Sequence, residues 1–293
     1  MSGPVASGAA GRPDAFGARL AEAMAARGPL CVGVDPHPSL LSAWDLPADV
    51  TGLERFALTA TEALAEHVAV LKPQSAFFES HGARGIAVLE RVLDTARQAG
   101  ALVLLDVKRG DIGSTMAAYA AAYLADGAPL AADAITVSPY LGFGSLEPAL
   151  SQARRTGRGV FVLARTSNPE GHAVQGATAA GDGTVAQSVV DAAAERNAGA
   201  EPLGDVGVVV GATVEPGEVR LDGLNGPVLA PGFGAQGATA RDLRRVFGPE
   251  LGAVLPASSR DVLRHGPSPL ALRTAVRRTR DELAAVVETA RSL

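Results

Sequence analysis

The stretch ALVLLDVK, residues Ala101–Lys108, is an apolar run that ends with an aspartate and a lysine. Such a run fits a parallel strand that is buried on both faces and carries polar groups only near its end. Similar runs recur along the 293 residues, so that eight strands are predicted. They are Pro29–Asp35, Val68–Lys72, Ala101–Lys108, Asp133–Ser138, Gly159–Arg165, Val206–Gly211, Pro227–Pro231 and Gly252–Pro256.

Helical patterns separate these strands. After the first strand, Thr51 and Glu54 have the spacing of a capping box, and apolar residues follow at helical intervals. After the second strand, another apolar helical face stops before Gly100. Eight strands with helices between them predict an α/β fold, a (β/α)8 TIM barrel in a single domain. A doubly wound open sheet is the alternative, although it usually has fewer strands.

The two segments with the weakest patterns are expected to be irregular. Residues 1–12 are rich in Gly, Ala, Ser and Pro, with neither a basic start nor an apolar core, so we expect a flexible N-terminal tail and no signal peptide. Residues 13–293 would then form the barrel. Residues 169–185 are predicted to be a long loop that serves the active face.

Composition excludes several classes of protein. Hydrophobic residues make up 47% and charged residues 19% of the chain, which excludes a disordered chain. A net charge of −5 argues against nucleic acid and anionic membranes as partners. No apolar run approaches the ~20 residues that span a bilayer. The single cysteine, Cys31, fits a core position in a cytoplasmic protein.

Lysine is almost absent from this chain. Of the 26 basic residues, only Lys72 and Lys108 are lysines, and both fall at predicted strand ends, where barrel enzymes place their chemistry. Asp106 lies two residues before Lys108, so both side chains point to the same side of the strand. Lys72, Asp106 and Lys108 therefore predict a cluster of alternating charges at the barrel mouth that binds a polar ligand, and Asp111 in the following loop could add a second carboxylate. A structural ion-pair network is the alternative.

A second set of residues points to phosphate binding. The loop after the seventh strand runs PGFGAQGAT from Pro231 to Thr239, and glycines let backbone N–H groups approach a phosphate closely. The helix that follows this loop would add the positive end of its dipole. Arg260, just past the eighth strand, could form a bidentate clamp. Glycine is abundant in this chain, with 34 residues, so the loop alone is a weak signal.

The run DVKRGD, Asp106–Asp111, resembles the Asp-x-Lys-x-x-Asp signature of the orotidine 5′-phosphate decarboxylase family. Asp35, Lys72, the PGFGAQ run from Pro231 to Gln236 and Arg260 strengthen the resemblance, which covers nearly the whole chain. The runs TVSPYLG, residues 136–142, and ARTSNP, residues 164–169, are similar to the longer, bacterial subgroup.

The resemblance implies an activity, an assembly and a set of site residues. The enzyme would convert orotidine 5′-monophosphate to uridine 5′-monophosphate and CO₂, the last step of de novo pyrimidine nucleotide biosynthesis, with no cofactor and no metal. It would be a homodimer with active sites at the interface. The catalytic residues would be Lys108 as the proton donor, Asp106, Lys72 and the partner's Asp111. The substrate-binding residues would be Asp35 for the ribose, Ile112 and Thr115 crossing with Asp111, Ser167 for the base (with Ser138 as the alternative), and Pro231, Gln236 and Arg260 for the phosphate.

Three other functions stay open on the sequence alone. A metal-dependent sugar-phosphate decarboxylase or aldolase shares the barrel and the signature, and a chelator would separate it from a metal-free decarboxylase. A lysine that forms a Schiff base, as in class I aldolases, would be trapped by borohydride. A noncatalytic nucleotide-binding protein would keep the pocket without the chemistry, although retention of all four charged residues argues against it. The five histidines show no shared metal-ligand spacing.

Overall fold

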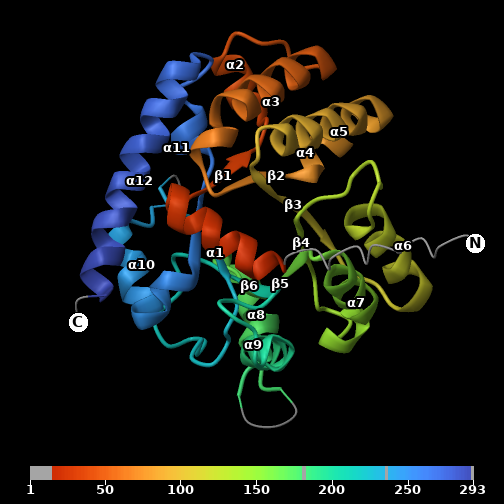
Figure 1. Cartoon of the computed structure of the whole chain (residues 1–293), viewed down its shortest axis with the longest axis vertical. Helices are drawn as coiled ribbons and strands as arrows, with labels where there is room; N and C mark the ends of the chain where they lie inside the picture. Colours follow the sequence, from red (N-terminus) through yellow and green to blue (C-terminus); the bar gives the residue numbers. More distant parts are fainter. Residues whose placement is uncertain (1–14, 180–182, 235–236, 292–293) are drawn as a thin grey trace, which may run out of the picture.

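Eight parallel strands close into a barrel in the computed structural model, which describes residues 15–179, 183–234 and 237–291 (Figure 1). β8 pairs with β1, which closes the sheet and confirms the predicted TIM barrel. The expected tail, residues 1–12, lies outside the described residues. The strands are β1 Cys31–Val34, β2 Val70–Pro73, β3 Leu102–Arg109, β4 Ala134–Val137, β5 Gly159–Arg165, β6 Val206–Val210, β7 Val228–Pro231 and β8 Val254–Ser258.

Helices surround the barrel between most successive strands (Figure 1). The β6–β7 connection, residues 211–227, is fully described and contains turns in place of a helix. Across the described chain, every helix is too short or too polar to cross a membrane. The helices are α1 Phe16–Arg27, α2 Pro38–Ala43, α3 Val50–Leu64, α4 Ser75–Glu79, α5 Gly82–Gln98, α6 Gly113–Leu124, α7 Glu147–Thr156, α8 His172–Gln175, α9 Val185–Asn197, α10 Ala240–Phe247, α11 Arg260–Leu263 and α12 Pro269–Arg291.

Two local predictions were wrong in detail. α3 begins two residues earlier than the predicted capping box implies, because the Asp49 carboxylate, in place of Thr51, caps it by accepting from the backbone N–H groups of Thr51 and Gly52. The segment after β5 is not irregular throughout, since Pro169–Gly171 and α8 form short helical turns before α9 begins at Val185. The predicted apolar face of α3 is buried, which confirms its orientation toward the barrel.

Helix α1 closes the N-terminal end of the barrel (Figure 1). The buried Phe16 ring packs edge-on against Phe161 of β5, with ring centroids 6.0 Å apart. Gly159 leaves the room that this ring occupies. Cys31 is buried in the same cluster, and burial raises the pKa of its thiol to about 12, so it is an inert core residue as predicted. This end of the interior is therefore apolar and filled.

Candidate active site

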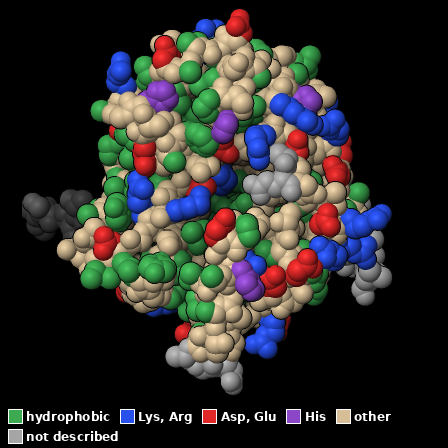
Figure 2. All heavy atoms as spheres, turned by 180° about the vertical axis from the view of Figure 1, so that it is seen from behind, with side chains coloured by type: hydrophobic (Ala, Val, Ile, Leu, Met, Phe, Trp, Pro, Cys, Tyr) green, Lys and Arg blue, Asp and Glu red, His purple; other side chains and the backbone are tan. Residues whose placement is uncertain are grey.

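The inward-facing positions of the strands change from apolar to polar toward their C-terminal ends. Along β3, Leu102 and Leu104 belong to the apolar interior, whereas Asp106 and Lys108 line a cavity of about 550 Å³. Side chains on one face of a strand recur every second residue, so one strand supplies both environments. All eight strands contribute lining residues, and the face that carries the opening is hollowed near its centre (Figure 2). The predicted site residues in this lining are Asp35, Lys72, Asp106, Lys108, Ser167, Pro231 and Arg260.

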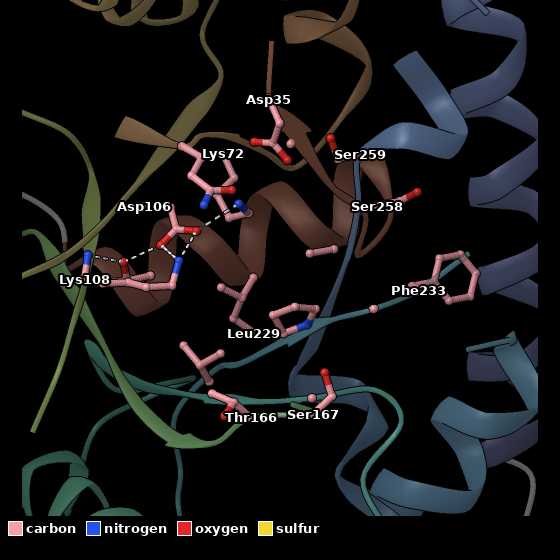
Figure 3. A pocket seen from close by; sticks show the side chains of 18 of the residues that line it. Asp35, Lys72, Asp106, Lys108, Thr166, Ser167, Leu229, Phe233, Ser258 and Ser259 are labelled. Carbon is pink, nitrogen blue, oxygen red and sulfur yellow. Dashed lines mark hydrogen bonds and ion pairs between the residues drawn. The ribbon is translucent and has the colours of Figure 1, made fainter. Parts of the chain in front are cut away.

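A carboxylate lies between two ammonium groups on one wall of the cavity (Figure 3). Lys108 Nζ lies 2.6 Å from Asp106 Oδ1 and 2.7 Å from Oδ2, and Lys72 Nζ lies 3.2 Å from Oδ2. Asp106 is 8% and Lys72 is 7% exposed, whereas the Lys108 side chain is 47% exposed toward the cavity. The predicted charge cluster thus exists, and Lys108 is its accessible end.

The cluster keeps its inner members ionised. Burial by itself raises the pKa of the Asp106 carboxyl, but Lys72 and Lys108 outweigh it and hold that pKa far below its ordinary value. Burial lowers the pKa of the Lys72 ammonium, but the carboxylates of Asp35 and Asp106 outweigh it and raise that pKa above its ordinary value. A fixed set of alternating charges therefore faces any molecule in the cavity.

The backbone of Lys108 adopts an unusual conformation, with φ at +45°. A lysine in this region costs on the order of 1–3 kcal/mol, and such residues cluster at functional sites. The register between β3 and β4 shifts between Leu105 and Arg109, around this residue. Thr136 of β4 secures the conformation, because its Oγ1 accepts from Lys108 N at 3.0 Å and donates to Asp106 Oδ1 at 2.7 Å. Thr136 was not predicted from the sequence, since a threonine in the run AITV is an ordinary strand residue.

Unpaired polar atoms gather where β1 and β8 end. Asp35 Oδ1 and Ser259 Oγ are both buried, and neither has a hydrogen-bond partner within the described chain. A Cβ atom on Gly33 would lie 2.8 Å from both Asp35 Oδ2 and Ser259 Cβ, so glycine is needed there. Buried polar atoms without partners are costly, and a ligand with hydroxyl groups would satisfy them. Ser259 adds a hydroxyl that was not predicted to belong to the site.

The opposite wall carries Thr166 and Ser167, which follow β5 (Figure 3). Ser167 lines the cavity, and Ser138 is not among the lining residues. Gln175 of α8 fixes this loop, because its Oε1 accepts from Thr166 N at 2.9 Å. A Cβ on Gly211 would lie 3.0 Å from Ser167, so the end of β6 packs closely under the serine. A polar group is thus held rigidly across from the charged wall.

The predicted phosphate loop borders the same cavity. Pro231 and Gly232 line it, Gly232 has φ at +107°, and the exposed side chain of Arg260 reaches it from the start of α11. Gln236 lies outside the described residues. Thr239 and Asp242 form a capping box at the start of α10 and do not line the cavity, so the contribution of this helix to phosphate binding stays a prediction. This capping box pairs the backbone N–H groups of Thr239 and Asp242 and places the Asp242 carboxylate at the start of α10.

Three predicted residues lie away from this cavity. Asp111, Ile112 and Thr115 are not among its lining residues. Asp111 Oδ1 accepts from Ile112 N at 2.7 Å, and Ile112 is 63% exposed. One chain therefore brings together Lys72, Asp106 and Lys108 and leaves Asp111 outside. Among the residues described, no three His, Cys, Asp or Glu side chains converge as metal ligands.

Fold and site together define a barrel protein that binds a polar small molecule at the C-terminal ends of its strands, next to a buried lysine–aspartate–lysine cluster. A model of the orotidine 5′-phosphate decarboxylase / HUMPS family matches residues 28–275. The chain belongs to this family.

Individual relatives agree with this assignment. The chain is 63% identical to a Salinispora arenicola protein named orotidine 5′-phosphate decarboxylase, over 90% of this chain and 95% of the relative. It is 59% identical to a Streptomyces coelicolor protein of the same name, over 94% and 98%. The crystal structure of a Streptomyces avermitilis candidate orotidine 5′-phosphate decarboxylase superposes with a TM-score of 0.92 at 59% identity, over 94% and 96%.

The low pKa of Asp106 predicts a pH-dependent contribution to stability. An aspartate in an unfolded chain has a pKa of about 3.9, so the stabilisation from the charged Asp106 is full above about pH 5 and is lost as the pH falls toward the lower folded value. Asp106→Asn should lower the free energy of unfolding by about 3 kcal/mol at pH 7, because Lys72 loses its partner. The difference in the free energy of unfolding between this variant and the unsubstituted protein should become smaller below about pH 4.

Urea unfolding at pH 7, 5, 4 and 3 measures this difference. Asp94→Asn is the matched control, because Asp94 forms an exposed pair with Arg97 on α5. A difference for Asp106→Asn that stays constant from pH 7 to pH 3 would contradict the assigned charge state.

Proposed function

We propose that this chain decarboxylates orotidine 5′-monophosphate to uridine 5′-monophosphate and CO₂, the last step of de novo pyrimidine nucleotide biosynthesis. The observation that carries the proposal is the buried Asp106 carboxylate held between Lys72 and Lys108 at the wall of the cavity. Family membership and the named relatives support the same reaction.

The chemistry follows from the charges in the cluster. Breaking the bond between C6 and the carboxylate leaves an electron pair on C6 that the ring carbonyls do not delocalise, so the site must stabilise it. Lys108 has an accessible ammonium for this, and one of its protons then moves to C6. Asp106 faces the departing carboxylate and repels it until CO₂ leaves. No step in this reaction requires a cofactor or a metal.

The remaining lining residues suit the other parts of the nucleotide. Asp35 and Ser259 offer unpaired buried oxygens to the ribose hydroxyls. Ser167 lies across the cavity from the lysines, in position for the amide edge of the pyrimidine. Pro231, Gly232 and Arg260 border the end where a phosphate would sit, and Gln236 belongs to the same loop. Neither nucleic acid nor a membrane is needed as a partner.

Lys108 gives the direct test of the reaction. Purified protein with EDTA throughout should remove the ultraviolet absorbance band of the orotate ring from orotidine 5′-monophosphate. Lys108→Ala should slow this loss by about a thousandfold or more, because both the proton donor and the charge opposite C6 disappear. Circular dichroism of the variant controls for folding. Absence of turnover by the folded, unsubstituted protein in EDTA, with turnover of sugar phosphates after addition of a divalent metal, would replace the proposal with the metal-dependent alternative.

Arg260 tests the position of the phosphate. Arg260→Ala should weaken binding of uridine 5′-monophosphate by about ten- to a hundredfold, since a hydrogen bond to a charged group is worth about 1.5–3 kcal/mol. Binding of uridine, which lacks the phosphate, should not change. Arg264→Ala is the matched control, because Arg264 caps the same helix and pairs with Asp261. Calorimetric titration measures the affinities of both ligands for the unsubstituted protein and the two variants, and an equal loss for nucleotide and nucleoside would remove Arg260 from the phosphate site.

The active site also implies a homodimer, which we propose on two observations. Asp111 and its neighbours lie outside the cavity of their own chain, and exposed apolar side chains stand in the loops after β3 and β4. These side chains are Ile112, Tyr140 and Leu141, which are 63%, 80% and 52% exposed. A partner that covers them would receive Asp111, Ile112 and Thr115 into its own cavity. A single buried thiol fits the cytoplasm as the location.

Mixing two inactive variants tests this shared site. If Asp111 crosses, Lys108→Ala and Asp111→Ala dimers are each inactive, but a hybrid dimer has one site free of both substitutions. After subunit exchange, the mixture should regain about a quarter of the activity of the unsubstituted protein, because half of the dimers are hybrids with one good site. Native mass spectrometry confirms that hybrids form. Hybrids without activity would place Asp111 in the cavity of its own chain.

A further inference from the structure

Arg109 lies between Lys108 and Asp111 in the sequence but points away from the cavity. Strand residues alternate between the two sides of a sheet, so Arg109 leaves the barrel interior where Lys108 enters it. Arg109 is not a lining residue of the cavity. It is nevertheless only partly exposed, with 29% of its side chain accessible. The guanidinium is therefore partly buried behind the wall of the cavity that Asp106 and Lys108 form.

The guanidinium of Arg109 joins two helices to β3. It forms an ion pair with Glu79 at the end of α4. It also donates to the hydroxyl of Tyr123 at 3.4 Å and lies 5.6 Å from the ring centroid of Tyr119, both on α6. Glu79 is itself held in place, because it accepts from Ser75 Oγ at 2.5 Å.

The helices joined in this way adjoin the other catalytic residues. α4 begins three residues after Lys72, and α6 begins two residues after Asp111. The backbone of Arg109 makes a further link. Its carbonyl oxygen accepts from the N–H of Ser138, which follows β4, at a distance of 2.8 Å. The contacts of Arg109 thus reach the helix that follows Lys72, the helix that follows Asp111 and the segment after β4.

The conformation of Lys108 needs such support. A lysine with φ at +45° persists only where its surroundings fix it. Thr136 Oγ1 accepts from the N–H of Lys108 inside the barrel. Outside the barrel, the ion pair with Glu79 anchors Arg109, which directly follows Lys108. We propose that Arg109 is a positioning residue, which fixes the strained Lys108 and the Asp111 segment relative to Lys72 without touching the substrate. This inference rests on the proposed decarboxylase function for its kinetic consequence.

The kinetic prediction separates kcat from KM. Arg109→Ala should lower kcat by about ten- to a hundredfold, because small misplacements of a reacting group have effects of this size. KM should change less than about threefold, since no contact to the substrate is removed. Arg109→Lys keeps the charge beside Glu79 but not the planar fork over Tyr119, so it should restore part of kcat. Arg91→Ala is the matched control, because Arg91 pairs with Glu54 between two outer helices, away from the site.

The two lysines provide a second, spectroscopic measurement. Protein labelled with carbon-13 at the lysine ε position has only two such signals, from Lys72 and Lys108, and Lys108→Ala assigns them. Arg109→Ala should shift the Lys108 signal, and Arg91→Ala should shift neither. If Arg109→Ala does not fold, Glu79→Gln removes the same ion pair from its other end and should shift the Lys108 signal in the same way.

The outcomes keep the two proposals apart. An unsubstituted protein without decarboxylase activity would overturn the proposed function, while the lysine signals still decide whether Arg109 positions Lys108. An unchanged Lys108 signal in the folded Arg109→Ala or Glu79→Gln variant would overturn the positioning role. So would a loss of activity that appears in KM and leaves kcat unaffected.

Discussion

A buried carboxylate between two ammonium groups is the constraint on which the structure of this site depends. Asp106 is 8% exposed, and each of its oxygens contacts at least one lysine. Removing charges from water costs several kcal/mol for each ion, and such pairs seldom stabilise a fold more than apolar residues of the same size. Ligand binding therefore explains this cluster better than fold stability does, because the cluster fixes positive and negative charges in place before the ligand binds.

The barrel supplies this constraint through register. Gly33 of β1 stands beside Lys72 of β2, and Gln74, which follows β2 directly, stands beside Asp106 of β3. Each of these positions continues an inward-facing row that starts in the apolar cluster around Phe16. The N-terminal half of the interior provides packing, and the C-terminal half is left free for polar groups. A shift of one residue in β2 or β3 would send Lys72, or Asp106 and Lys108, outward.

Periodicity and residue choice were enough to predict the barrel and the charged wall of its cavity. Apolar runs located all eight strands, and the scarcity of lysine pointed to Lys72 and Lys108. Features that depend on exact backbone geometry were missed, because the pattern is the same with or without them. The hydrogen bonds of Thr136 lie beside the register shift next to Lys108, and the cap of α3 falls to Asp49 because the helix starts two residues earlier than the pattern suggested.

The proposed crossing of Asp111 to a second chain would change the charge of the site. Asp35, Lys72, Asp106 and Lys108 sum to zero, so the cavity wall that these residues form in a single chain is neutral. Asp111 adds a negative charge only if it comes from another chain, since its own carboxylate lies outside this cavity. That charge would oppose the anionic substrate unless it lies beside the exposed ammonium of Lys108, where it would orient the proton donor. Because Arg109 ties the segment of Asp111 to the same strand as Lys108, a chain that positions its own lysine also positions the carboxylate it would offer to its partner. Proton donation by Lys108 and the shared site of the dimer would then both depend on the backbone from Lys108 to Asp111.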